Sequence, residues 1–341
     1  MKAVRIHSHG DVDVLCIDNI SEPKCLNNTV KVQVKASALN HLDIWVRGGL
    51  PGINIPLPLI MGSDGSGKVV EIGENIKNFN VGDDIVIQPG TFDQNCKFVK
   101  NKMENYSPTY GILGETENGI QAEYVILKEN NLHKMSNSLT YEEAASMQLV
   151  FMTAYQMLIT RANLFPEDFI LIYGATSGIG SASIQIAKDI GAKVITTVGS
   201  ENKFQYAYDM GADYVLNHKQ SLVDKIKSIT KYKGVNIVCE HIGKDTWEQS
   251  LKVLSKGGKI VTCGSTTGSI VSIDLRHLFM KQQSILGSTM SNIESFKKVM
   301  EKIESKKYKP FIDKVYNFNQ IKNAHKRIES RNHSGKVVLI P

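Results

Sequence analysis

The sequence predicts an α/β protein of two domains, a barrel-like β domain and a domain built on a doubly wound parallel sheet. Three observations predict this division. Short strands crowd the first 127 residues, a strand–helix–strand alternation begins near Leu158, and a glycine-rich turn lies inside that alternation. With 341 residues, 42% of them hydrophobic, the chain is long enough for two separate cores.

Alternation with a period of two predicts the strands of the first domain. Residues 30–36 alternate apolar and polar side chains, and residues 67–73 and 84–87 are short apolar runs bounded by turn residues. Several short strands at this spacing are typical of a closed or barrel-like sheet.

Five strands separated by helices predict the second domain. We expect these strands at residues 169–173, 193–198, 214–216, 235–239 and 259–263. Such alternation specifies a parallel sheet with right-handed crossovers. A helix at 292–306 and a strand at 335–340 are expected to return to the first domain. The predicted domains are therefore residues 1–127, 128–285 and a returning segment 286–341.

The glycine-rich turn predicts a dinucleotide site. It runs from Gly174 through Ser177 and Gly178 to Gly180, directly after an apolar strand and before a helix. Glycines let the backbone turn tightly against a pyrophosphate, which the helix N-terminus attracts. The same spacing occurs in short-chain dehydrogenases, which carry a Tyr-xxx-Lys pair after the turn. The only such pair in this chain, at residues 124–128, precedes the turn, so we reject that alternative.

The end of the second strand favours NADPH over NADH. An NAD site would place Asp or Glu there against the ribose 2′-hydroxyl, whereas this chain has Gly199 and Ser200, with Lys203 three residues on. A hydroxyl and a cation suit a 2′-phosphate. Glu201 lies beside them and either turns outward or weakens the preference for NADPH.

Composition excludes several other classes of function. The net charge of +6 comes from scattered basic residues, so we expect no nucleic-acid partner. No apolar stretch approaches the length of a signal peptide core or a membrane span, so we expect a cytoplasmic protein with no membrane contact. Five widely spaced cysteines with no CxxC pair argue against both a disulfide framework and a zinc ribbon.

Nearly the whole chain resembles the medium-chain dehydrogenase/reductase superfamily, and within it the NADPH quinone oxidoreductases. The segments that carry the resemblance are 38–48, 62–67, 81–83, the glycine-rich turn, 199–203, 243–251 and 331–341. It implies a GroES-like β-barrel domain made from both chain ends, a Rossmann domain inserted between them, and a cleft that holds the nicotinamide. It also implies a homodimer and a small-molecule quinone or enone substrate.

The resemblance also indicates that the metal sites of zinc-dependent relatives are lost. Where they hold a catalytic zinc with Cys and His, this chain has Asn40 and the pair Ser63–Asp64. Amide and hydroxyl groups are poor zinc ligands, so we expect no metal. In the loop that matches their four-cysteine lobe only Cys96 remains, with Asp93, Val99 and Ser107 at the other positions.

Site residues follow from the turn and from the resemblance. Asn40 and Asp43 are the predicted catalytic residues, Asn40 as a polar contact in the cleft and Asp43 as support for its loop. The predicted cofactor contacts are Thr153, Gly174, Ala175, Ser177, Gly178, Ile179, Gly180, Ser200, Lys203, Asn217, His218, Cys263, Gly264, Ser265, Gly287, Ser288 and Arg331.

The leading hypothesis is therefore a zinc-independent NADPH reductase of quinones or other α,β-unsaturated carbonyls. Hydride transfer belongs to the cofactor, so the protein need only position the reactants and stabilise charge on the substrate oxygen. Two alternatives stay open: an alcohol dehydrogenase of the same superfamily, and an NADPH-binding sensor with little turnover.

Overall fold

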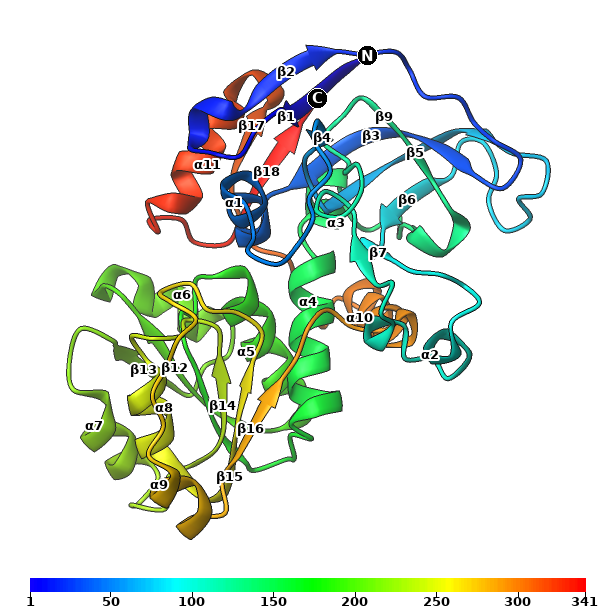
Figure 1. Ribbon diagram of the computed structural model, residues 1–341. Coiled ribbons are helices and arrows are strands. Elements are labelled where there is room, and N and C mark those ends of the chain that lie inside the picture. Colours follow the sequence, from blue (N-terminus) through cyan, green and yellow to red (C-terminus); the bar gives the residue numbers. More distant parts are fainter. The chain divides into compact units, whose positions relative to one another are not determined.

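The computed structural model describes residues 1–341 and divides into two units (Figure 1). The β unit comprises Met1–Leu149, Asn292–Met300 and Lys309–Pro341. The α/β unit comprises Val150–Ser291 and Glu301–Tyr308. No helix in either unit combines the length and the apolar content that a membrane crossing requires.

Three sheets form the β unit. One has the strand order β2-β1-β4, the largest has the order β10-β6-β5-β3-β18-β17 with β9 also paired to β3, and β7 pairs with β8. The strands are β1 (Lys2–Ile6), β2 (Cys16–Asn19), β3 (Val30–Ala38), β4 (Leu59–Ile60), β5 (Asp64–Ile72), β6 (Asp84–Ile87), β7 (Gly90–Thr91), β8 (Gly111–Ile112), β9 (Tyr124–Leu127), β10 (Leu132–Lys134), β17 (Ile312–Asn317) and β18 (Lys336–Ile340).

Strand β3 shows why the period-two pattern gave the right strands. Val30, Val32 and Val34 are buried, while the residues between them are partly exposed. The returning strand was also predicted: β18 pairs antiparallel with β3, with Val338 opposite Ala38. The last residues of the chain thus complete the sheet that the first forty begin.

Helices of the β unit are short. They are α1 (His41–Gly48), α2 (Lys97–Lys100), α3 (Tyr141–Ala145) and α11 (Ile321–Glu329). Two more helices cross the division between the units, α4 (Gln148–Tyr155) near its start and α10 (Ile293–Glu304) at Met300.

The structure divides the chain after Leu149, whereas the sequence placed the first boundary after residue 127. Two bonds explain the difference. The Gln148 side-chain amide donates to the Gly65 carbonyl at 2.9 Å, and the Leu149 N–H donates to Asp64 Oδ1 at 2.9 Å. The start of α4 is therefore tied to β5.

Six parallel strands form the sheet of the α/β unit, in the order β13-β12-β11-β14-β15-β16. They are β11 (Phe169–Ile172), β12 (Lys193–Val198), β13 (Tyr214–Asn217), β14 (Val235–Glu240), β15 (Leu254–Thr262) and β16 (Ser284–Gly287). The helices are α5 (Gly178–Ile190), α6 (Phe204–Asp209), α7 (Leu222–Ile229), α8 (Trp247–Val253) and α9 (Leu275–Met280). The first five strands were predicted; β16 was not.

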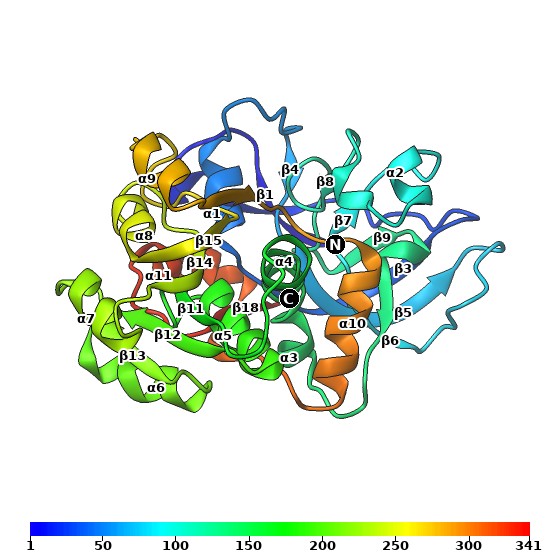
Figure 2. The ribbon, with the colours of Figure 1, turned by 90° about the horizontal axis from the view of Figure 1, so that it is seen from below.

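The chain order reverses at β11, which pairs with β12 on one side and β14 on the other. Right-handed crossovers then put α5 and α8 on opposite faces of the sheet, as Figure 2 shows. In such sheets ligands bind outside the carboxyl ends of the strands, beside the reversal. The glycine-rich turn lies at that point.

Candidate functional site

Two glycines give the turn after β11 its shape. Gly174 has a φ of +64°, a conformation that L side chains rarely adopt. A Cβ built on Gly180 would lie 2.1 Å from the Gly174 carbonyl oxygen, so helix α5 approaches the turn more closely than any side chain allows. The predicted requirement for glycine therefore has a steric cause at both positions.

Ser177 caps helix α5. Its Oγ accepts a hydrogen bond from the Gly180 N–H at 2.9 Å, and its own N–H donates to the Gly174 carbonyl at 2.9 Å. Gly178 and Ile179 are the first residues of α5, where backbone N–H groups have no intrahelical acceptor. Free donors at the positive end of a 13-residue helix make an anion site that fits a pyrophosphate.

The rest of the turn is held by β12. Ala175 donates its N–H to the Thr197 carbonyl at 2.9 Å, and Gly174 donates to the Thr197 hydroxyl at 3.1 Å. The turn is therefore rigid before any ligand binds.

His241 is a residue of this edge that sequence reasoning missed. It follows β14, and its Nε2 lies 2.9 Å from the Tyr173 carbonyl oxygen, next to Gly174. Burial lowers the pKa of His241, so the ring is neutral at pH 7. Its position directly after an apolar strand was the signal that could have identified it.

A buried carboxylate fixes the loop that carries His241. The side chain of Glu240 is fully buried and accepts five hydrogen bonds of 2.7–3.1 Å from the N–H groups of Ile242 and Gly243 and the hydroxyls of Thr246 and Ser250. Hydrogen bonds to an ionised acceptor are among the strongest in proteins. The loop after β14 is thus held without a cation.

Two of the predicted cofactor contacts, Lys203 and His218, follow β12 and β13. The ring of His218 lies against Gly199, where an added Cβ would be 3.2 Å from two ring atoms. The backbone N–H of His218 donates to the Val198 carbonyl at 3.1 Å. Burial, and after it the charges of Lys219 and Lys203, lower the pKa of His218. The positive charge of Lys203 therefore acts on the His218 ring.

Three other predicted contacts have different surroundings. The Ser200 hydroxyl donates to the Asn202 side chain at 2.5 Å, so it must rotate to reach a phosphate. Asn217 Oδ1 accepts the Lys219 N–H at 3.0 Å and shapes the turn after β13. Arg331 belongs to the β unit, where it follows α11 and is exposed.

The predicted nicotinamide-side residues follow β15 and β16. Cys263 donates its N–H to the Glu240 carbonyl at 3.3 Å, and Ser288 donates to the Thr262 carbonyl at 2.9 Å. The Ser288 hydroxyl oxygen is buried and has no hydrogen-bond partner. An orphaned hydroxyl at this edge fits a polar group of a bound cofactor.

Four further predicted contacts lie in the same place. Thr153, on α4, places its hydroxyl 3.9 Å from the sulfur of Met290, just past β16. The carbonyls of Gly264, Ser265 and Gly287 accept bonds from the protein itself. Most of the predicted cofactor contacts of the α/β unit thus follow the carboxyl ends of its strands.

Asn40 lies in a buried ionic network of the β unit. Its Nδ2 donates to Asp64 Oδ2 at 2.8 Å, and its Oδ1 accepts a hydrogen bond from the Lys336 ammonium. Lys336 also donates to Asp64 Oδ2 at 2.9 Å, and Leu149 donates to Oδ1. Asn40 is 5% exposed, Asp64 0% and Lys336 5%. Of the Asn40 amide, only the second N–H remains for a ligand.

Asp43 forms a hydrogen bond with the backbone of Asn40. Its carboxylate accepts the Asn40 backbone N–H at 2.7 Å at the start of α1. Burial raises the pKa of Asp43 from 3.8 to about 7, although the Asn40 N–H and the Lys336 charge act in the opposite direction. Asp43 is 2% exposed, so it acts through Asn40.

This donor set does not fit a zinc ion. Zinc sites use thiolate, imidazole and carboxylate groups with free lone pairs. Here the amide of Asn40 replaces a thiolate, both oxygens of Asp64 already accept hydrogen bonds, and the Lys336 ammonium occupies the place of a cation.

The loop that matches the four-cysteine lobe is organised by hydrogen bonds. Asp93 Oδ1 accepts the Asn95 N–H at 3.0 Å, and the hydroxyls of Ser107 and Thr109 lie 2.9 Å apart. With a single thiol, Cys96, these residues do not form a tetrahedral zinc site.

Arg47 belongs to a second buried network. It bonds to His325 Nδ1 at 3.2 Å and to the carboxylate of Glu329, which joins α1 to α11. Burial, and then the Arg47 charge, lower the pKa of His325 from 6.5 to about 3. His325 is therefore neutral in the folded protein over most of the pH range.

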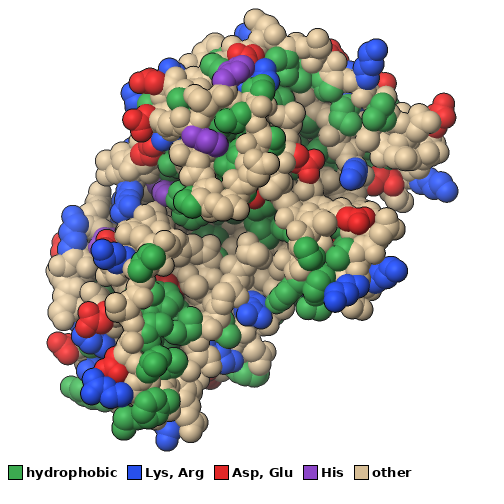
Figure 3. All heavy atoms as spheres, in the orientation of Figure 1, with side chains coloured by type: hydrophobic (Ala, Val, Ile, Leu, Met, Phe, Trp, Pro, Cys, Tyr) green, Lys and Arg blue, Asp and Glu red, His purple; other side chains and the backbone are tan.

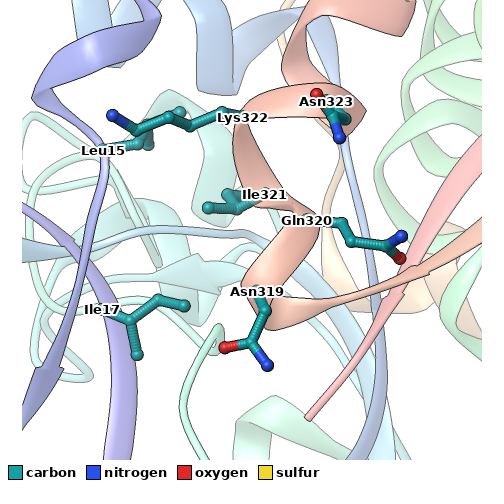
Figure 4. Close-up of a pocket in the computed structure, with 7 residues that line it drawn as sticks. All are labelled: Leu15, Ile17, Asn319, Gln320, Ile321, Lys322 and Asn323. Carbon is teal, nitrogen blue, oxygen red and sulfur yellow. The ribbon is translucent and has the colours of Figure 1, made fainter.

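One pocket of the β unit lies away from all these residues. Its volume is about 390 Å³. Figure 4 shows its lining, which comes from the segment around β2 and from the start of α11: Leu15, Ile17, Asn319, Gln320, Ile321, Lys322 and Asn323. It contains none of the predicted catalytic or cofactor residues.

A GroES-like β unit and an α/β unit with a dinucleotide turn define a class of two-domain oxidoreductases, and comparisons with known proteins agree. Residues 27–137 match the family described as alcohol dehydrogenase GroES-like domain, and residues 178–305 match the family described as zinc-binding dehydrogenase. The chain belongs to the medium-chain dehydrogenase/reductase superfamily.

Three similar proteins show how broad that superfamily is. Crotonyl-CoA carboxylase/reductase of Cereibacter sphaeroides is 30% identical over 97% of this chain and 84% of its own. Quinone oxidoreductase of Homo sapiens is 27% identical over 100% and 98%. A solved structure of an NAD-dependent alcohol dehydrogenase is 37% identical over the full length of both chains, with a TM-score of 0.97. The chain is therefore an oxidoreductase of nicotinamide dinucleotides.

Proposed function

We propose that this chain is an NADPH-dependent, zinc-independent reductase of quinones or other α,β-unsaturated carbonyls. The observation that carries the proposal is the closed Asn40–Asp64–Lys336 network, at the positions where zinc-dependent relatives are expected to hold their catalytic metal. A metal would lower the pKa of an alcohol substrate. Quinones and enones need no such activation, because they carry their own electron sink.

The proposed mechanism assigns the chemistry to the nicotinamide, which supplies the hydride when NADPH is bound. The chain binds and orients it. The N–H groups of Gly178 and Ile179 hold the pyrophosphate, and the orphaned Ser288 hydroxyl holds a polar group at the carboxyl ends of β15 and β16. The proton that completes the reduction comes from solvent.

Within this proposal Asn40 contacts the substrate and Asp43 is a positioning residue. Asp43 accepts the Asn40 N–H, and Asn40 leaves one N–H of its amide for a substrate oxygen. A single neutral donor is a weaker electrophile than a metal, which again favours a substrate that accepts hydride readily.

The preference for NADPH rests on Lys203, His218 and Ser200, with Arg331 as a further proposed contact. Lys203 and His218 follow β12 and β13, and the charge of Lys203 acts on the His218 ring, which supports both as contacts of the 2′-phosphate. Glu201 in the same turn is the group that would favour NADH instead.

An alcohol dehydrogenase is the second candidate. It is supported by the 37% identity and TM-score of 0.97 to the NAD-dependent alcohol dehydrogenase. The two candidates differ in what they need: alcohol oxidation at neutral pH needs a group that lowers the alcohol pKa, and the Asn40 network offers none.

A substrate panel tests the proposal. The purified protein is assayed with NADPH and 1,4-benzoquinone or an enone, and with NADP⁺ or NAD⁺ and primary and secondary alcohols, before and after treatment with a chelator. We expect quinone or enone reduction to be faster and insensitive to the chelator. Faster alcohol turnover, or activity lost on chelation and restored by zinc, would overturn the proposal. Tight NADPH binding without turnover of any substrate would indicate a sensor.

We also propose a homodimer joined through strand β16. This strand lies at the edge of its sheet and pairs only with β15. Apolar side chains are exposed beside it on α9, with Leu275 at 65%, Phe279 at 68% and Met280 at 70%, and Figure 3 shows hydrophobic atoms gathered over that end of the unit. Light scattering of wild type and Phe279→Glu tests this; a monomeric wild type would overturn it.

A cytoplasmic location also remains a proposal, which cell fractionation tests.

A further inference from the structure

Three metal-ligating side chains meet on the outer face of the N-terminal strand pair. They are His7, Cys16 and Asp18, and one ligand atom of each lies within 4.8 Å of the other two. None of them belongs to the predicted catalytic or cofactor residues. They offer imidazole, thiolate and carboxylate, the three ligand types that zinc uses in proteins.

The pairing of β1 and β2 explains why these side chains meet. The strands are antiparallel, with Arg5 opposite Cys16 and Ala3 opposite Asp18. Because side chains alternate between faces, Cys16 and Asp18 share one face, and His7, two residues after Arg5, extends the same face from the other strand. The cluster is therefore set by backbone register and not by a chance loop contact.

The opposite face of the same strands is apolar. Val4 and Ile6 of β1 are fully buried. Leu15 and Ile17, on either side of Cys16, line the pocket against the start of α11 in Figure 4. Core packing thus holds the backbone that carries the three ligands.

The cluster is open to solvent, so an ion can enter. The His7 side chain is 55% exposed and the Asp18 side chain 25% exposed. Cys16 is half-buried and its thiol donates to the Arg5 carbonyl at 3.3 Å. Ligand atoms around tetrahedral zinc are roughly 3.3–3.7 Å apart, from metal–ligand distances of about 2.0–2.3 Å. The three ligand atoms already lie within 4.8 Å of one another, and the exposed His7 ring, now hydrogen-bonded to Asp18, is the ligand with most room to adjust.

The three ligands neutralise a bound divalent ion, and Arg5 adds one positive charge beside them. Asp18 Oδ2 now lies 2.8 Å from His7 Nε2 and 2.9 Å from the Arg5 guanidinium. A neutral imidazole, a thiolate and a carboxylate bring two negative charges to a divalent ion, and Arg5 stays beside the carboxylate. Its positive charge weakens the site relative to one without a cation.

We propose that His7, Cys16 and Asp18 bind a divalent transition metal, with zinc as the best match to the ligand set. On binding, the Cys16 S–H bond breaks, its proton goes to solvent, and the thiolate sulfur, His7 Nε2 and one Asp18 oxygen bond to the metal; water fills the fourth position. The ion joins β1 to β2. It is unrelated to catalysis in this chain.

Cobalt(II) chloride, which resembles zinc in size and is coloured, is the probe. The full-length, chelator-treated protein is titrated, and absorption from thiolate-to-cobalt charge transfer is recorded. We expect saturation at one ion per chain. Cys16→Ser should abolish the band, and His7→Gln should weaken binding at least tenfold. The matched control is Cys25→Ser, which removes another half-buried thiol of the β unit and should change nothing.

A second measurement needs no variant. Zinc should protect Cys16 of the wild-type chain from iodoacetamide, read by mass spectrometry of the peptides, while Cys25 is labelled at the same rate with and without zinc. Absence of a cobalt band in wild type, its persistence in Cys16→Ser, or equal labelling of Cys16 with and without zinc would each overturn the proposal.

Discussion

The two polar centres of this molecule are built in opposite ways. At the carboxyl ends of the strands of the α/β unit, the buried hydroxyl of Ser288 has no hydrogen-bond partner, and Gly178 and Ile179 begin helix α5, where backbone N–H groups have no intrahelical acceptor. In the Asn40–Asp64–Lys336 network, nearly every donor and acceptor is used internally. Unpaired buried groups are costly and persist where a ligand pairs with them, whereas a network that satisfies itself has no such need. The open centre is therefore expected to control binding, and the closed one stability.

The largest expected effect comes from breaking the closed network. Lys336→Met leaves the fully buried Asp64 carboxylate without its cation, and removal of one partner of a buried ion pair costs about 3–5 kcal/mol. We expect a loss of that size in urea unfolding. Adding Asp64→Asn should recover part of it. Lys314→Met, on the exposed side of neighbouring β17, is the control and should stay within about 0.5 kcal/mol. A Lys336→Met protein as stable as that control would show that the network is not essential.

Filling the open centre should abolish cofactor binding. Gly180→Val places a Cβ 2.1 Å from the Gly174 carbonyl, so α5 must move away from the turn. We expect the Kd for NADPH to rise at least a hundredfold, which corresponds to about 2.7 kcal/mol, when measured by quenching of protein fluorescence. Gly48→Ala, whose Cβ meets nothing within 4 Å, should bind normally. Wild-type affinity in Gly180→Val would contradict the proposed role of the turn.

Acid titration sharpens the comparison inside the β unit, because two buried groups there oppose each other. The pKa of His325 is depressed to about 3, so the unfolded chain binds its proton first and stability falls as pH drops below 6.5. The pKa of Asp43 is raised to about 7, so the folded chain binds its proton first and stability falls as pH rises from 3.8 towards 7.

Between about pH 4.5 and 6.5 these two contributions have opposite slopes of at most about 1.4 kcal/mol per pH unit. In wild type we expect these two contributions to cancel, which leaves the fall on acidification that His218 and His241 of the α/β unit cause through their lowered pKa. Relative to wild type, His325→Gln, which keeps an acceptor for Arg47, should lose stability as pH rises, and Asp43→Asn should lose stability as pH falls. Parallel profiles for all three proteins, from urea unfolding at each pH, would refute both assignments.

The smallest expected effect is at the rim of the open centre. Lys203→Ala should weaken NADPH about tenfold, since a charge-assisted hydrogen bond contributes roughly 1.5–3 kcal/mol, and should leave NADH nearly unchanged. The matched control is Lys233→Ala. Lys233 lies just before the amino end of β14, whereas the cofactor is proposed to bind at the carboxyl ends of the strands. Equal losses for both cofactors would mean that Lys203 supports the fold and not the phosphate. A wild type that prefers NADH would point to Glu201.

The same contrast explains what could be predicted from the sequence. Strands β11, β12 and β14 are apolar runs bounded by glycine, and their pattern alone gave their positions and the turn between them. Strand β16 was missed because its four residues begin and end with Ser284 and Gly287, and it is recognised only by pairing with β15.

Polar networks were harder to predict because their members are far apart in sequence. Asn40 was recognised through the resemblance, but its partner Lys336 lies 296 residues away and no local pattern joins them. His241 was missed for a related reason: its place at the turn depends on a contact with the Tyr173 carbonyl, just after the neighbouring strand β11. Local periodicity predicts helices and strands, whereas the candidate sites depend on contacts between residues far apart in the sequence.

Asp64 and Lys336 are in contact but 272 residues apart in the sequence, so they are synthesised at different times. All six strands of the α/β unit have left the ribosome before β18 is translated, so that unit can fold while the β unit still lacks its last strand and its buried cation. We expect a chain that stops after Tyr308 to yield a protease-resistant fragment covering residues 150–308, with the preceding residues digested. Resistance of the N-terminal segment in that truncated chain would show that nascent β3 and β5 need neither β18 nor Lys336.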